Sequence, residues 1–160
     1  MSTVLELESA ILELPADEFW KLADWFDAAK DEAWSKQMQA DAEAGRLDFL
    51  FAEVAATQAV GGWQEMAGPS VNSTATPRFW QRLHEMPEEV QALALKNYQL
   101  WLANPQHPSL NYKRLAGAGH RFSVRVGNHY RAIAWKRDDG GVEWVWIGTH
   151  VEYDRLLGQR

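Results

Sequence analysis

The sequence contains no cysteine, so the chain can form neither a disulfide bond nor a thiolate metal site. It also has no apolar run close to the ~20 residues that a membrane-spanning helix needs. Glu6, Glu8 and Glu13 interrupt the N-terminal stretch, so it has no secretory hydrophobic region. The Asp, Glu and His residues show no spacing typical of a metal site. These absences predict a cytoplasmic protein that uses no metal or cofactor and does not contact a membrane.

Positive charge is scarce in the first half of the chain. Residues 1–74 hold 4 Lys and Arg against 14 Asp and Glu, whereas residues 75–160 hold 12 against 8, together with all five histidines. So few cations argue against DNA binding by the first half. The basic half could approach a polyanion, and the acidic half could cover it. One chain could therefore hold an activity and its own inhibitor.

Apolar residues are plentiful, at 46% of the chain with nine tryptophans, which is typical of a globular protein. The first 60 residues carry helical patterns throughout. We expect a helix capped by Ser2 or Thr3, a second after Pro15, and a third that starts at Asp27 or Asp31 and ends at Gly45.

A fourth helix is predicted from Leu47 to Val60, and its apolar face is too large for 60 residues to bury alone. This helix should therefore pack on another part of the protein. The residues expected in that interface are Leu47, Leu50, Phe51 and Val54.

The chain changes character after a stretch rich in Gly, Pro and Ser at 61–74, which is typical of a flexible linker. Two helices are predicted next, at 78–83 and 88–102. Alternating patterns then predict strands at 110–115, 121–126, 130–135 and 142–147, followed by a short helix at 150–157. The second half should thus be an α+β domain of two helices packed on a three- to four-stranded antiparallel sheet.

One face of the predicted sheet is cationic. Arg121, Ser123 and Arg125 alternate with apolar residues, and a tight hairpin would bring Arg131 beside them. Further site candidates come from neighbouring segments: Lys113 and Arg114 from the preceding strand, and His150 with Tyr153 at helical i, i+3 spacing. Such a group suits phosphate chemistry, with cations holding the phosphate and His or Tyr moving protons. The alternative is an ordinary solvent-facing strand with a structural histidine.

Three ordered blocks of the second half resemble the RelE/ParE superfamily of toxins. They are HPSLNYKRL at 107–115, FSVRVGNHYRA at 122–132 and WVWIGTHVEYDRLL at 144–157. The resemblance implies one of two activities. RelE-like members are ribosome-dependent endoribonucleases that cut mRNA and inhibit translation without a metal, whereas ParE-like members poison DNA gyrase.

The resemblance also implies roles for individual residues. Arg125 stands at a cationic position of the active-site strand, and Arg131 at the position that binds the scissile phosphate. His150 and Tyr153 stand where the family keeps its acid/base and RNA-stacking groups. Apart from the resemblance, the positive charge of Lys113, Arg114 and Arg121 on the sheet leads us to expect that they bind RNA. Ser123 departs from the lysine that some relatives have at its position.

Residues 1–60 resemble the short helical antitoxin that accompanies such toxins, through LPADEF at 14–19, WSKQMQAD at 34–41 and AGRLDFL at 44–50. We therefore expect an antitoxin at 1–60, a linker at 61–74 and a toxin at 75–160. The antitoxin would bind in cis or across a homodimer, and Asp41, Glu43, Asp48 and Glu53 are the acids expected near the cationic strands. The released toxin would act on the ribosome and mRNA. The alternatives are a gyrase poison and a catalytically silent regulatory complex.

Overall fold

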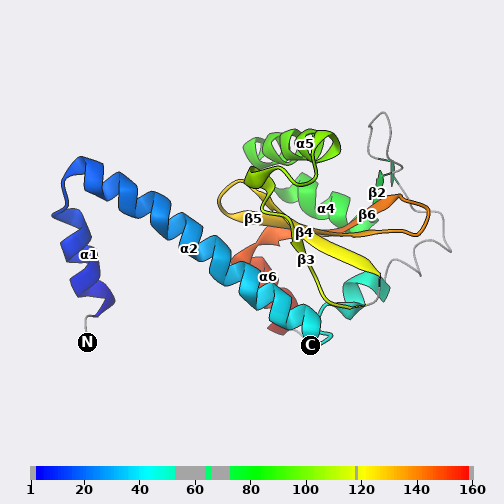
Figure 1. Cartoon of the computed structure of the whole chain (residues 1–160), viewed down its shortest axis with the longest axis horizontal. Coiled ribbons are helices and arrows are strands. Elements are labelled where there is room, and N and C mark those ends of the chain that lie inside the picture. Colours follow the sequence, from blue (N-terminus) through cyan, green and yellow to red (C-terminus); the bar gives the residue numbers. More distant parts are fainter. Residues whose placement is uncertain (1–2, 53–63, 66–72, 118, 159–160) are drawn as a thin grey trace. The chain divides into compact units, whose positions relative to one another are not determined.

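A computed structural model describes residues 3–52, 64–65, 73–117 and 119–158 (Figure 1). By their internal contacts the residues divide into two compact units, Met1–Lys36 and Gln37–Arg160. In the part of the chain that is described, no helix combines the length and apolarity needed to cross a membrane. This boundary, after Lys36, does not coincide with the expected antitoxin at 1–60 and toxin at 75–160, and those two segments remain a proposal about function.

The first unit contains helix α1, Val4–Leu12, and most of helix α2, Ala16–Glu43. Helix α1 begins at Thr3, whose hydroxyl accepts a hydrogen bond from the backbone N–H of Glu6, while the Glu6 carboxylate accepts one from the backbone N–H of Thr3 at 2.8 Å. This capping box confirms Thr3 as the helix start. Helix α2 is continuous, so the predicted new start at Asp27 or Asp31 is wrong. No Gly or Pro interrupts this stretch, and the aspartates accept helical geometry.

Helix α2 ends where the sequence predicts, because Gly45 takes a φ of 73°, in the left-handed region that glycine adopts at little cost. Residues 48–52 are helical again. They form the described part of the helix expected from Leu47 to Val60. Val54 lies outside the described residues.

The second unit contains the predicted α+β domain. Its helices are α4, Pro77–Glu85, α5, Glu88–Ala103, and α6, His150–Gly158. Its three long strands are β4, His120–Val126, β5, Tyr130–Lys136, and β6, Val142–Thr149, paired antiparallel in chain order. The β4–β5 turn has three residues, 127–129, rather than the expected two, and this longer turn is what places Arg131 opposite Arg125.

Two predictions about the sheet need correction. The strand expected at 110–115 is a 3-10 turn, Pro108–Leu110, followed by a two-residue strand β3, Lys113–Arg114, because Asn111 between them takes a left-handed φ of 40°. Within the predicted linker, Gln64–Glu65 form β1 and Ser73–Ala75 form β2. Strand β2 pairs parallel with β6, and the Ser73 hydroxyl accepts a hydrogen bond from Trp144 Nε1 at 3.1 Å. The resulting order among the described strands is β1-β2-β6-β5-β4-β3.

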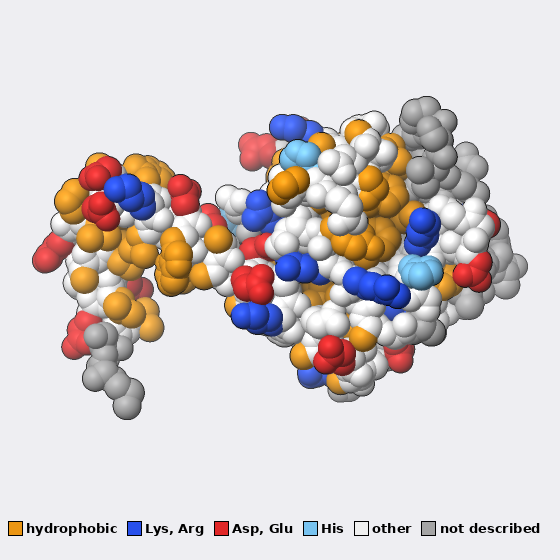
Figure 2. All heavy atoms as spheres, viewed as in Figure 1, with side chains coloured by type: hydrophobic (Ala, Val, Ile, Leu, Met, Phe, Trp, Pro, Cys, Tyr) orange, Lys and Arg blue, Asp and Glu red, His pale blue; other side chains and the backbone are white. Residues whose placement is uncertain are grey.

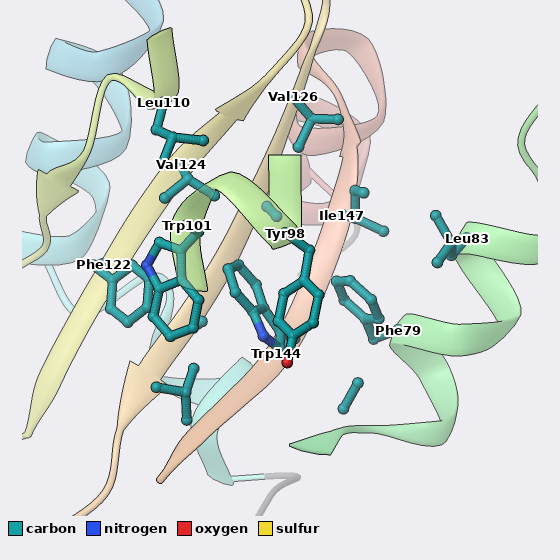
Figure 3. Close-up of a cluster of buried hydrophobic side chains, with 14 of the residues drawn as sticks. Phe79, Leu83, Tyr98, Trp101, Leu110, Phe122, Val124, Val126, Trp144 and Ile147 are labelled. Carbon is teal, nitrogen blue, oxygen red and sulfur yellow. The ribbon is translucent and has the colours of Figure 1, made fainter. Parts of the chain in front are cut away.

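Helices α4 and α5 pack on one face of the sheet around Trp144 (Figure 3). The Trp144 ring makes edge contacts with Tyr98, Trp101 and Phe122, with centroids 5.4–6.2 Å apart. Such edge-to-face pairs add to the free energy gained by burying aromatic area. This core covers one face of the sheet, so the strand side chains that point away from it lie on the opposite face.

Trp144→Ala should lower the free energy of unfolding by about 3–5 kcal/mol, because it leaves a large cavity among aromatic rings. The measurement is a urea unfolding curve in which circular dichroism reports the folded fraction. Leu95→Ala on α5 is the control, since half of that side chain is exposed, and it should cost no more than about 1 kcal/mol. A loss at Trp144 as small as that at Leu95 would contradict this account of the core.

Candidate functional site

The face of the sheet opposite α4 and α5 carries the predicted cationic residues. Phe122, Val124 and Val126 point into the core, as the alternation predicts, so Arg121 and Ser123 lie on the other face. That face is covered rather than open to solvent. Arg121 is 6% exposed and Arg131 is fully buried. The sequence led us to expect that the acidic half covers the cationic strands, and acids of that half do reach this face.

The chain itself covers this face. We define the covering segment as residues 37–52, which comprise the last part of α2, the turn after it and the helical residues 48–52 (Figure 1). Its apolar side chains are buried in the second unit: Met38, Ala42, Leu47, Leu50 and Phe51. Leu47, Leu50 and Phe51 are thus buried, and their role in an antitoxin–toxin interface stays a prediction. A sheet face and an amphipathic segment remove each other's apolar surface from water.

Arg121 makes the most direct contact between the sheet and the covering segment. Its Nη1 forms an ion pair with Asp48 Oδ1, and its guanidinium lies over the Phe51 ring, 4.2 Å from the centroid. Phe51 also packs against Trp135, at a centroid distance of 6.4 Å. Gly117 makes room for this arrangement, because a Cβ there would lie 2.2 Å from Arg121 Nη1. The Arg121 guanidinium is thus in contact with both the Asp48 carboxylate and the Phe51 ring.

Tyr153 makes a second contact of this kind. It lies on α6, is fully buried, and donates a hydrogen bond from its hydroxyl to Asp41 Oδ2 at 2.8 Å. The other Asp41 oxygen forms an ion pair with Arg46 at 2.5 Å. Burial raises the pKa of Tyr153 far above its usual value, and the hydrogen bond to Asp41 raises it further. The phenol is thus held protonated, with its hydroxyl turned to the covering segment.

His150 begins α6, three residues before Tyr153, as the predicted helical spacing requires. About half of its side chain is exposed. Its Nε2 is 2.7 Å from the Gln37 side-chain oxygen, and its Nδ1 is 3.7 Å from Asp154 Oδ2. The Gln37 amide also donates to Asp154 at 2.7 Å, so Gln37 contacts both side chains. The His150 imidazole is therefore reachable from solvent, next to the equally exposed Asp154 carboxylate.

The remaining predicted site residues lie farther along the strands. Arg131 donates a hydrogen bond from Nη1 to the Ser123 hydroxyl at 3.0 Å, which makes Ser123 a buried support for the arginine. Arg125 is half-buried opposite Arg131, and its carbonyl accepts from Asn97 at 3.0 Å. Lys113 is half-buried and Arg114 is exposed, both on the edge strand β3. The structure brings Arg125, Arg131 and Ser123 together and leaves Arg114 at the sheet edge.

Two residues of this face were not predicted from the sequence. Gln37 contacts His150, yet no pattern distinguishes it from the other polar residues of a long helix. Glu143 is fully buried on β6 and accepts hydrogen bonds from Trp135 Nε1 and Arg137 Nη1. A lone acid within the apolar run of β6 was the signal for a buried ion pair. In the described ranges, no group of three or more His, Asp and Glu side chains is placed to hold a metal ion.

Two groups of the face already have carboxylate partners: Arg121 pairs with Asp48, and the Tyr153 hydroxyl donates to Asp41. A phosphate group could bind Arg121 only by displacing Asp48, and it could reach the Tyr153 hydroxyl only by displacing Asp41. Glu43, by contrast, is exposed and accepts from Gln39 one turn earlier in the same helix. Asp41 and Asp48 are therefore the acids that meet the face, whereas Glu43 does not, and Glu53 lies outside the described residues.

Tyr153→Phe should lower the free energy of unfolding at pH 7 by about 1–3 kcal/mol, because it leaves the buried Asp41 oxygen without its donor. The raised pKa of Tyr153 stabilises the fold fully below the ordinary tyrosine value of 10.0, and this contribution is lost as the pH rises through the folded-state value. The gap between wild type and Tyr153→Phe should therefore narrow above pH 10. Urea unfolding of both proteins from neutral to alkaline pH tests this, and a gap that stays constant would contradict it.

One comparison with known proteins bears on this geometry. No curated protein sequence matches the chain. Residues 88–155 match the family described as the ParE-like toxin domain. The matched range runs from the first residue of α5 through the three long strands into α6, and it contains Arg121, Arg131, His150 and Tyr153. The match supports the assignment of this part of the chain to the RelE/ParE superfamily, as the toxin of a toxin–antitoxin system.

Proposed function

We propose that this chain is a toxin fused to its own antitoxin, in which the covering segment keeps the active face of the toxin domain silent. The observation that carries the proposal is the pairing of Arg121 with Asp48 and of Tyr153 with Asp41. Arg121 and Tyr153 lie within the range that matches the toxin family. Their partners, Asp48 and Asp41, come from the acidic half of the chain.

Apolar contacts and charge have different parts in this inhibition. Burial of Leu47, Leu50 and Phe51 should contribute on the order of 5 kcal/mol to the binding of the covering segment, before its ordering entropy is subtracted. Asp48 is more than half exposed, so its ion pair adds little to stability, about 0–1 kcal/mol. Its larger effect is to repel a polyanion from Arg121 by like charge.

We propose further that the uncovered domain cleaves mRNA on the ribosome as a metal-independent endoribonuclease. The 2′-hydroxyl of a nucleotide would lose its proton to His150 and attack the adjacent phosphorus, and the bond to the 5′-oxygen would break. Tyr153, freed from Asp41, would donate the proton that the 5′-oxygen takes up. Arg125 and Arg131 would stabilise the charge that develops on the phosphate oxygens. The products are a 2′,3′-cyclic phosphate and a 5′-hydroxyl.

A second candidate function is poisoning of DNA gyrase, which the ParE-like description of the matched family favours. A gyrase poison is a binder, so it does not require its arginines to reach a scissile phosphate. The complete burial of Arg131 fits that role without rearrangement. The two candidates differ in the nucleic acid that breaks, and one expression experiment separates them.

The full chain should be harmless in cells, and the double variant Asp48→Arg, Phe51→Ala should arrest growth. The new arginine faces Arg121 and the lost ring removes an anchor, so both changes weaken the covering segment. Glu43→Arg makes the same change of charge at an exposed site of that segment and should stay harmless. Growth after induction, mapping of mRNA ends and assay of DNA breaks are the measurements.

Cut mRNA without DNA breaks supports the endoribonuclease, and DNA breaks support the gyrase poison. If the double variant is folded and harmless, the inhibitor proposal is wrong. Any comparison with an isolated toxin should keep β1 and β2. A truncation at Ala75 would remove Ser73, which accepts the hydrogen bond of Trp144.

In the double-variant background, His150→Ala should slow mRNA cleavage by ribosomes about a hundredfold or more, because it removes the proton acceptor. His84→Ala is the matched control: His84 stacks on Trp80 on α4 and lies outside the matched family range. The measurement is the cleavage rate in a purified translation mixture. Equal rates for the two histidine variants would show that His150 is not in the catalytic site.

A further inference from the structure

Helix α6, which carries His150 and Tyr153, follows strand β6 without a loop between them. The strand ends at Thr149 and the helix begins at the next residue. The Thr149 hydroxyl accepts a hydrogen bond from the backbone N–H of Glu152 at 3.2 Å, and the Glu152 carboxylate accepts one from the backbone N–H of Thr149 at 2.7 Å. This pair is a capping box. The direction of the first turn of α6 is therefore set where Thr149 and Glu152 meet.

Strand β6 has an outer edge that β2 covers only in part. Strand β2 pairs with β6 as far as Trp144, and no other described strand pairs with this edge beyond that residue. Arg82 on α4 reaches the remaining part of the edge and donates a hydrogen bond from Nε to the Ile147 carbonyl at 2.8 Å. The carbonyl that a further strand would have paired is thus satisfied by an arginine.

The Arg82 guanidinium makes two further contacts. Its Nη2 is 3.5 Å from Glu152 Oε1, and its central carbon lies 5.4 Å from the centroid of the Trp146 ring. Trp146 in turn packs edge-on against the Tyr153 ring, at a centroid distance of 5.7 Å. One side chain from α4 therefore contacts the edge of β6, the cap of α6 and the ring against which Tyr153 packs.

Gly148 shows how closely these groups approach one another. A Cβ at this position would lie 2.7 Å from Trp146 Cζ2 and 2.9 Å from Glu152 Oε2, so only glycine fits there without a shift of its neighbours. The junction between β6 and α6 therefore has little room in which the cap could take another position.

Arg82 differs from an ordinary surface arginine. Figure 2 shows Lys and Arg side chains at many separate places on the second unit, so a cation at the surface is not by itself a sign of function. The Arg82 side chain is only 23% exposed. It uses the planar fork of the guanidinium for a carbonyl and a carboxylate at once, which a lysine cannot do.

We infer that Arg82 is a positioning residue, which fixes the first turn of α6 and thereby the placement of His150 and Tyr153. The inference rests on the proposed function for the roles of these two side chains. Arg82 itself lies outside the matched range 88–155, on a helix that packs on the other face of the sheet (Figure 1). Its effect on catalysis would come from geometry, since a shift of about 1 Å in a reacting group can slow a reaction about a hundredfold.

The first test measures mRNA cleavage by the full chain in the double variant whose covering segment is weakened. Arg82→Lys should lower kcat about tenfold or more and leave KM within about twofold. The lysine keeps the charge, but its single nitrogen cannot bond the Ile147 carbonyl and Glu152 at the same time. Arg78→Lys, at an exposed arginine of the same helix, is the matched control and should leave kcat unchanged.

The second test does not depend on activity. Amide hydrogen exchange of the full chain, followed by NMR, should be at least about tenfold faster at Thr149 and Glu152 in Arg82→Lys than in wild type, and unchanged in β4 and β5. Leu83→Ala removes a buried side chain of α4 and lowers the stability of the core. It should not accelerate exchange selectively at these two amides, so it separates positioning of α6 from a general loss of stability.

Faster exchange at the cap together with a lower kcat supports the inference. Three results would overturn it: equal exchange at Thr149 and Glu152 in Arg82→Lys and wild type, an equal loss of kcat in Arg78→Lys, and an unchanged kcat in a background in which His150→Ala slows cleavage. A double variant that cuts no mRNA would instead contradict the proposed function. The exchange data would then decide alone whether Arg82 fixes the first turn of α6.

Discussion

The second face of the sheet has to be covered, and the rest of the structure depends on how this is done. Helices α4 and α5 cover only one face. The other face carries Arg121, Arg131 and Trp146, large side chains that are buried because α6 and the covering segment lie over that side. The contact of Arg121 with Asp48 and Phe51 joins these parts through one guanidinium, which uses its charge toward the acid and its flat surface toward the ring.

If the covering segment is an inhibitor, as we propose, then the same contact surface both stabilises the domain and inhibits it. A segment that buries apolar residues stabilises the domain, and the acids it carries exclude other anions from the same place. The protonated phenol of Tyr153 fits this view, because its hydrogen bond to Asp41 is intact only while the segment stays bound. Any ligand of the face must therefore offer more than a negative charge. It must also replace the apolar contacts of Leu47, Leu50 and Phe51.

Several features could be read from the sequence because they depend on neighbours along the chain. The strands β4 to β6 and the two helices before them follow from alternation and turn residues, whereas the Arg125–Arg131 register depends on a three-residue turn that the sequence did not predict. Others could not. Helix α2 runs through Asp27 and Asp31. An aspartate caps a helix only where the residues before it are not themselves helical, and here they are. Strand β2 formed within a stretch of linker composition, because β6 offered an unpaired edge.

The sequence by itself determined which residues could form the site: the alternation of β4 puts Arg121 and Ser123 on the face away from the core, and helical spacing puts His150 near Tyr153. It also determined that residues 1–74 are acidic and that the segment around Leu47 needs a surface to pack on. Only the tertiary structure decided that this surface is the cationic face, so that Asp48 meets Arg121 and Asp41 meets Tyr153. Periodicity fixes the direction of a side chain from its own element, whereas its partner depends on contacts between residues more than 70 positions apart.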